Sequence, residues 1–254
     1  METRPLLIVL QIYPGDQLQG LGLTKLIADI EPEVRIDVEF MVAYKRDCST
    51  KIVEEIISEA SRSFKVVRSI RCKRFGSSWP VGPNDLWQDT MTSISVMSKN
   101  ERLNVSGVLT FEPDCIPLRP DWLDCLIREW KNRRPGNECV GHLHGDGKEQ
   151  GMRHINGNGM FDPYITRNHQ ELSGSDGIAG WDCYHAHTLL KVGQDTNFIF
   201  QIYKAEGLDI DDVRAIRKGN VIPALFHGIK GDSGIKIVRE MIENGDFTNR
   251  PSKL

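Results

Sequence analysis

Residues 5 to 131 alternate between short apolar runs and segments whose apolar residues recur at helical spacing, and this alternation constrains the fold most strongly. The run from Pro5 to Ile12 is apolar at almost every position, which is typical of a strand covered on both faces. Strands are predicted at 5–12, 34–44, 65–72 and 108–111, and helices at 18–30, 50–60, 84–97 and 121–131. Such repeated units predict an α/β fold, with a mostly parallel, Rossmann-like central sheet flanked by helices.

The second half of the chain has weaker periodicity. Residues 132–182 are rich in Gly, Asn and His, which predicts long functional loops around short strands. Further helices are predicted at 182–192, 195–206, 211–217 and 233–243, and a strand at 221–226. We therefore expect one domain over residues 1–254, in which the 132–254 half supplies the long loops.

Composition narrows the class of protein. The 254 residues are 39% hydrophobic and 26% charged, and no apolar run approaches the ~20 residues needed to cross a bilayer. The start of the chain has no signal-peptide pattern, and the six cysteines form no CxxC pair, so we expect a cytoplasmic protein with free thiols and no membrane partner. The net charge of −3 argues against a protein that coats nucleic acid, although a local basic patch is compatible with it.

Two carboxylates directly follow the predicted strand at 108–111. Glu112 and Asp114 flank Pro113, which ends the strand and stiffens the turn. Acids at the carboxyl edge of an open α/β sheet lie where such folds bind ligands, and Mg²⁺ prefers one or two carboxylates plus substrate oxygens. A plain surface turn is the alternative.

A late segment, Phe226-His227-Gly-Ile-Lys230-Gly231, combines an imidazole and an ammonium group with glycines. Glycines let the backbone approach a phosphate closely, and neutral imidazole is a metal ligand that favours Mn²⁺ over Mg²⁺. A buried, hydrogen-bonded structural histidine is the alternative for His227.

Two further polar segments are candidate sites. His154, Asn156 and Asn158 alternate with glycines, as suits a tight backbone that presents hydrogen-bonding groups to a sugar, or a structural Asx turn. Trp181 and Asp182 open a predicted helix, where Asp182 can be a catalytic carboxylate, a helix cap or both.

The order of these motifs resembles the glycosyltransferases of the GT-A fold, over residues 6 to about 236. The resemblance rests on the strand end at Gln11–Tyr13, the acid pair at 112–114 and the segment 226–231. In that family an Asp-x-Asp motif holds Mn²⁺ or Mg²⁺ on the diphosphate of a nucleotide sugar. Here Glu112 replaces the first aspartate, so the resemblance supports Asp114 more strongly as the ligand.

The same resemblance implies roles for other residues. It makes residues 1–131 the nucleotide-sugar-binding half and 132–254 the acceptor-binding and catalytic half. His227 would complete the metal sphere, and Lys230 would meet phosphate. Donor-binding residues would be Gln11, Tyr13 stacked on uracil, Trp79, Asn84 and Glu112, although half-burial explains Tyr13 and helix capping explains Asn84 equally well. An inverting enzyme needs a carboxylate base, for which Asp182 is the first candidate and Asp176 the second.

The sequence gives less information about the acceptor than about the nucleotide-sugar donor. A basic cluster at 68–74 contains Arg71 and Arg74, although such runs are usually solvated faces. A compact enzyme of this kind resembles phage-type transferases that glycosylate 5-hydroxymethylpyrimidines in double-stranded DNA, which would place it in a host cytoplasm. Arginines would then position phosphates, and the target base would be flipped. A glycan, a lipid-linked sugar, a protein and a small metabolite are the other acceptors.

Two alternative functions belong to other classes of protein than the glycosyltransferases. His144, Asp146 and His227, with Arg239, fit the ligand pattern of an iron oxygenase that uses 2-oxoglutarate, but that fold is all-β. The other is a non-catalytic module that binds sugar nucleotides or DNA.

Overall fold

The computed structural model describes residues 4–31, 33–76, 78–145, 152–202, 209–219, 221–228 and 231–247. Its strands are β1 (Leu6–Ile12), β2 (Arg35–Tyr44), β3 (Phe64–Arg71), β4 (Gly107–Phe111), β5 (Cys115–Pro117), β6 (Cys139–His144), β7 (His154–Phe161), β8 (Gly193–Asp195), β9 (Ile199–Gln201) and β10 (Leu225–His227). Its helices are α1 (Gln17–Ile30), α2 (Thr50–Ala60), α3 (Val81–Lys99), α4 (Trp122–Lys131), α5 (Ile165–Asn168), the 3₁₀ helix η1 (Gln170–Ser173), α6 (Trp181–Tyr184), α7 (Ala186–Val192), α8 (Ile210–Arg217) and α9 (Ser233–Glu243).

The strands form a large sheet and a small one. The large sheet has the order β3-β2-β1-β4-β7-β6-β8, in which β3, β2, β1 and β4 are parallel and β7 runs antiparallel to β4. The small sheet has the order β5-β10-β9. The predicted α/β architecture is therefore confirmed, and an all-β oxygenase fold is excluded. Asp146, which that reading required, lies outside the described residues.

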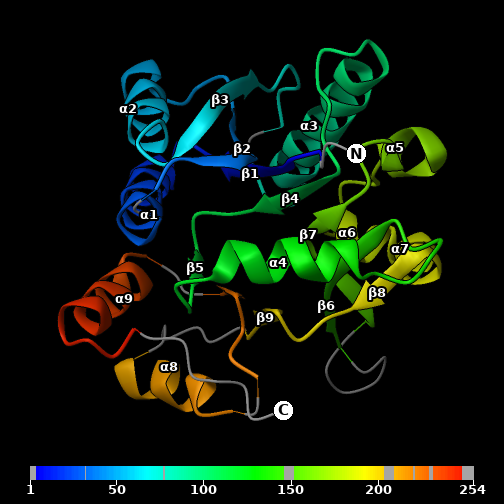
Figure 1. The fold of residues 1–254 in the computed structure, drawn as a ribbon. Coiled ribbons are helices and arrows are strands. Elements are labelled where there is room, and N and C mark those ends of the chain that lie inside the picture. The colour runs from blue at the N-terminus through cyan, green and yellow to red at the C-terminus, as the bar shows by residue number, and fades with distance from the viewer. Residues whose placement is uncertain are drawn as a thin grey trace.

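Side chains of β1 alternate between two hydrophobic cores, one on each face of the large sheet. Leu6, Ile8 and Leu10 pack with α1, α2, α4 and α9, whereas Leu7 and Val9 pack with α3, α5, α6 and α7. Figure 1 shows α1 and α2 on the opposite side of the strands from α3, with the small sheet near α8 and α9. Coverage on both faces explains why β1 is apolar at every position except Gln11. No described helix is long and apolar enough to cross a membrane.

The predictions for the second half were partly wrong. The helix predicted at 195–206 is replaced, where described, by the end of β8 and by β9, which pairs with β10. Asp195, Thr196 and Asn197 favour turns, and a Thr196 hydroxyl that accepts from the Phe198 N–H at 3.1 Å stabilises one here. The predicted helix at 182–192 is split into α6 and α7, and the predicted strand at 221–226 is the shorter β10.

Candidate functional site

The strand order of the large sheet reverses between β1 and β4, and both predicted donor segments lie at this point. The two strands are parallel and in register, with Leu10 opposite Phe111. Gln11 therefore lies next to the start of the acid turn at Glu112. Open α/β sheets bind ligands in the crevice that such a reversal creates at the carboxyl ends of the strands.

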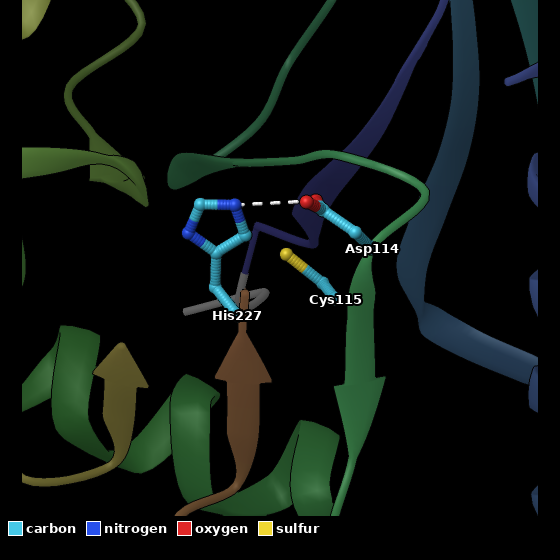
Figure 2. A group of neighbouring side chains, drawn as sticks. All are labelled: Asp114, Cys115 and His227. Carbon is cyan, nitrogen blue, oxygen red and sulfur yellow. Dashed lines mark ion pairs between the residues drawn. The ribbon is translucent and has the colours of Figure 1, made fainter. Parts of the chain in front are cut away.

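The small sheet brings His227 to the same place. In the β5–β10 pair His227 lies opposite Cys115, the residue after Asp114. Its Nε2 is 3.2 Å from Asp114 Oδ1 and 3.3 Å from Glu112 Oε2. Figure 2 shows the imidazole extending from the end of β10 toward the Asp114 carboxylate, with Cys115 beside them. Residues 113 positions apart in the chain thus meet within hydrogen-bonding distance (227 − 114).

The residue after His227 has a constrained backbone. Gly228 has a φ of 114°, and a Cβ atom there would lie 2.1 Å from the carbonyl oxygen of Ile202. Only glycine fits this position, because a side chain would be strained in φ and would clash with the backbone of the neighbouring segment. The path of the backbone directly after His227 therefore depends on this glycine.

Asp114, Glu112 and His227 affect one another's protonation. Burial by itself lowers the pKa of His227, but hydrogen bonds and charge from Asp114 and then Glu112 outweigh it and raise that pKa to about 9. Without a metal, His227 is therefore protonated at neutral pH and compensates the buried Asp114 carboxylate.

The donor set fits a hard or borderline divalent cation. Two ligand atoms at right angles and ~2.1 Å from one ion are about 3 Å apart, close to the measured separations of 3.2 and 3.3 Å. Two carboxylate oxygens and one imidazole nitrogen suit Mn²⁺ better than Mg²⁺. The metal role of Asp114 and His227 stays a prediction, as does that of Glu112.

Metal binding has a predictable dependence on pH. The ordinary pKa of histidine is about 6.5 and that of folded His227 is about 9, so the His227–carboxylate pair stabilises the fold fully below 6.5 and stops doing so as pH rises through 9. A cation on Nε2 must displace that proton. We expect the Mn²⁺ affinity to rise about tenfold per pH unit between pH 7 and 9, measured by titration calorimetry. His227→Gln should abolish this slope, and a steep slope in that variant would refute the assignment.

The Asn156–Asn158 segment belongs to β7 and supports the acid turn. The Asn158 Oδ1 accepts the Glu112 N–H at 2.9 Å, and the Asn156 Oδ1 accepts the Asn158 N–H at 2.9 Å. Both asparagines are buried and also line the pocket described below. The predicted loop is therefore a strand that orients Glu112, and its role in binding sugar stays a prediction.

Asp182 lies in the first turn of α6 and its carboxylate is held by backbone donors. The N–H of Gly157 donates to Oδ2 at 3.0 Å, and the N–H of Cys183 donates to Oδ1 at 2.9 Å. Gly180 is the cap of α6, so the capping role considered for Asp182 is wrong. Trp181 is buried and stacks on Trp87 with ring centroids 3.6 Å apart.

Half of the predicted site residues line one pocket. Its walls are Gln11, Pro83, Asn84, Glu112, Asn156, Gly157, Asn158, Gly180, Trp181, Asp182 and His227. Gln11 is buried, and its Nε2 has no hydrogen-bond partner among the described residues. An unsatisfied amide in a pocket is available to a ligand.

The Asn84 amide is already engaged, because its Oδ1 accepts the Trp181 N–H at 2.7 Å and its Nδ2 donates to Ala179 O at 2.9 Å. It lies inside α3, so its predicted capping role is wrong.

Other predicted residues do not line this pocket. Tyr13 is half-buried against the core, and burial followed by the charge of Glu112 raises its pKa. Trp79 is 74% exposed, and the exposed Asp176 closes a turn by accepting the N–H of Ile178. His154 does not line the pocket but contacts Asp182, which does, with 3.7 Å between His154 Nε2 and Asp182 Oδ2. Lys230 is outside the described residues.

The two arginines predicted from the basic cluster differ in how many partners they have. Arg74 contacts Asp89 at 3.1 Å and Asp85 at 3.7 Å and donates to Gln88, which leaves it little capacity for a phosphate. Arg71 is exposed and donates to the carbonyl of Arg46 at 3.1 Å.

Gly157 contributes to the site in a way that the sequence analysis missed. A Cβ atom there would lie 2.8 Å from the Trp181 ring, so the absence of a side chain lets Trp181 pack against β7. Its N–H also holds Asp182. Glycine inside a buried strand often marks such a close approach, and the Gly-Asn alternation was the available signal.

The fold is shared with solved glycosyltransferases. The galactosyltransferase LgtC, in complex with donor and acceptor sugar analogues, has a TM-score of 0.55 at 14% identity over 97% of this chain and 98% of that one. Mouse xyloside xylosyltransferase 1 in its apo form has a TM-score of 0.56 at 10% identity over 92% of this chain and 99% of that one. The glycosyltransferase GlyE of Streptococcus pneumoniae TIGR4 has a TM-score of 0.51 at 13% identity over all of this chain and 66% of that one. No family model and no curated protein matches the sequence. At these identities the likeness confirms the GT-A fold.

Proposed function

We propose that the protein is a metal-dependent glycosyltransferase that moves a hexose from a nucleotide sugar, of which a UDP-sugar is our first choice, to a hydroxyl acceptor. The observation that carries the proposal is the meeting of Asp114, Glu112 and His227 beside a polar pocket at the strand-order reversal. A non-catalytic binding module would not need a buried carboxylate and an imidazole that converge at a pocket. The shared fold with LgtC, whose structure holds donor and acceptor sugar analogues, supports the same conclusion.

The chemistry of sugar transfer explains the residue types. Cleavage of the sugar–phosphate bond develops negative charge on the departing diphosphate. A divalent cation held by Asp114 and His227 would supply Lewis-acid stabilisation of that charge. Gln11 offers an uncommitted amide N–H to the donor at the same edge.

Asp182 is the proposed base for an inverting transfer. It faces the pocket, and two backbone N–H groups fix the direction of its carboxylate, so one oxygen lone pair can accept the acceptor's proton. Asp176 is the weaker candidate, because it is exposed and does not line the pocket.

A thermal-shift screen of nucleotide sugars with Mn²⁺ tests donor binding. A ligand present at 100 times its Kd stabilises the folded state by about 2.7 kcal/mol, which corresponds to a rise in Tm of roughly 5–10 °C for a chain of this size. We expect the largest shift with a UDP-sugar and Mn²⁺ together, and release of free UDP on incubation. Equal shifts in Tm with and without Mn²⁺ would show that donor binding does not need the metal. Binding of the nucleotide sugar without its hydrolysis or transfer would favour the non-catalytic module.

We propose 5-hydroxymethylpyrimidine in DNA as the first acceptor to test. The exposed Arg46, Arg71 and Lys73 support it, because exposed basic side chains can contact phosphates. We expect Arg71→Ala to weaken duplex binding and to lower the slope of log affinity against log salt by about 0.9, the contribution of one phosphate contact. Arg214→Ala on α8 is the matched control. An unchanged slope in Arg71→Ala would redirect the search to glycan, protein or small-molecule acceptors.

A further inference from the structure

A second group of metal-ligating side chains lies beside the Asp114–His227 pair. His154, at the start of β7, and Asp182 and Cys183, on α6, each offer one ligand atom, and these atoms all lie within 4.8 Å of one another. His154 Nε2 and Asp182 Oδ2 are 3.7 Å apart. Three side chains of three chemical types therefore face one point.

The groups around His154 and Asp182 already fix these two side chains in a ligating arrangement. The Nδ1–H of His154 donates to the carbonyl of Met152 at 2.7 Å, so the lone pair of the neutral ring is on Nε2, which faces Asp182. The Asp182 carboxylate is itself held by the N–H groups of Gly157 and Cys183. Metal-binding histidines almost always donate their second N–H to a carbonyl or a carboxylate, and ligating carboxylates are hydrogen-bonded in the same way.

The separation between His154 and Asp182 is close to that of two ligands in tetrahedral coordination. Nitrogen and oxygen atoms ~2.0–2.1 Å from one zinc ion at the tetrahedral angle are about 3.3 Å apart. Closing 3.7 Å to that value requires only a small side-chain rotation. A fourth ligand is available in His144, which is paired with His154 across β6 and β7, with the ring centroids 5.4 Å apart.

The donor set differs in chemical character from that of the first site. Each group contains an aspartate, a cysteine and a histidine, but Glu112 adds a second carboxylate to the first group, and Cys115 there donates its S–H to Asn158 Oδ1 at 3.3 Å. Imidazole nitrogen and thiolate sulfur select zinc-type ions, whereas the second carboxylate suits Mn²⁺ or Mg²⁺. We propose that His154, Asp182 and Cys183, with His144 as fourth ligand, form a second metal site that prefers Zn²⁺. The two sites would bind different ions in one protein.

Zinc in this site would act on the proposed reaction, and this consequence alone depends on the proposed function. Coordination would occupy the Asp182 carboxylate, which could then no longer accept a proton from the acceptor. Zn²⁺ would therefore inhibit a Mn²⁺-loaded enzyme without displacing Mn²⁺ from Asp114 and His227.

Cobalt is the probe that tests the site without any assay of activity. Co²⁺ added stoichiometrically to the Mn²⁺-saturated protein should give the visible bands of tetrahedral cobalt and a near-ultraviolet sulfur-to-cobalt charge-transfer band. Cys183→Ser should lose the charge-transfer band, and His154→Gln should weaken Zn²⁺ binding by at least about 100-fold in competition with a chromophoric chelator. Circular dichroism of each variant would establish that it is folded.

Cys115→Ser is the matched control, because Cys115 lies in the other cluster with Asp114 and His227. It should keep the band. A band that disappears in Cys115→Ser and persists in Cys183→Ser would overturn the proposal, as would the absence of any tetrahedral cobalt spectrum.

Thiol labelling gives a second measurement, which remains informative if His154→Gln fails to fold. Five of the six cysteines are buried and Cys183 is partly exposed, so a chromogenic disulfide reagent should modify Cys183 first. Zn²⁺ should slow this reaction at least tenfold, and an unchanged rate would count against the site. Zinc binding without any transferase activity would refute the proposed function and leave the proposed zinc site intact. Transferase activity without zinc binding would refute the zinc site and leave the proposed function intact.

Discussion

Asp114→Asn is expected to fold with a lowered Tm, because buried His227 loses a charged partner, and to lose Mn²⁺-dependent sugar transfer by at least about 10³-fold. The substitution keeps the volume of the side chain but removes the buried negative charge that faces His227 at 3.2 Å. Cation affinity should fall with it, because a neutral amide is a far weaker ligand for a hard ion. Initial rates over a range of Mn²⁺ concentrations, together with thermal unfolding, measure both effects.

Asp211→Asn is the control for this experiment. Asp211 lies on α8 with 84% of its side chain exposed, and the same change there removes the same formal charge far from the pocket. It should leave the rate within about twofold, as is usual for exposed sites. Activity of Asp114→Asn within tenfold of the parent protein would remove the metal from the mechanism.

Trp87→Ala is expected to lower the free energy of unfolding by about 3–5 kcal/mol and Tm by roughly 6–20 °C. Trp87 is fully buried, stacks on Trp181 and meets Phe161 edge-on with centroids 5.7 Å apart. The cavity would form directly beneath the residue that precedes Asp182, so the transfer rate should fall in the same variant. Denaturant unfolding and initial rates separate the two effects.

Trp79→Ala provides the comparison, since it removes the same side chain from a position that is 74% exposed. It should change stability by no more than about 0.5 kcal/mol. A raised KM for the nucleotide sugar in a protein of unchanged stability would support the predicted donor contact of Trp79. Equal losses of stability in both variants would contradict the buried role of Trp87.

The first half of the fold was predictable because its signals are local. In β1, and in the apolar faces of α2 and α4, the period of the hydrophobic pattern identifies the element, and the structure reproduces each within a few residues. The β7 strand was not predictable in this way. Gly157 and Gly159 have low strand propensity, and they are favoured there because Trp181 and β6 pack where side chains would otherwise lie.

The sequence identified many of the residues of the candidate site, but it said much less about their contacts and roles. Asp114 stood out because it follows an apolar strand, and His227 because Gly228 and Gly231 follow it, but no local pattern could show that the two meet. Asn84 illustrates the limit, since both ends of its amide bind residues 95 and 97 positions away. Long-range pairings of this kind depend on the folded arrangement of the strands.

The small sheet has a further consequence for how this site can change by insertion or deletion. Phe226 and His227 are successive residues of β10, so one points into the core and the other toward the acids. One residue gained or lost between Leu225 and His227 would exchange these two directions, placing a benzyl group against the carboxylates and an imidazole in hydrocarbon. The length of a three-residue strand is therefore as essential to the centre as the identity of its last side chain, whereas length changes beyond Gly228 leave that alternation untouched.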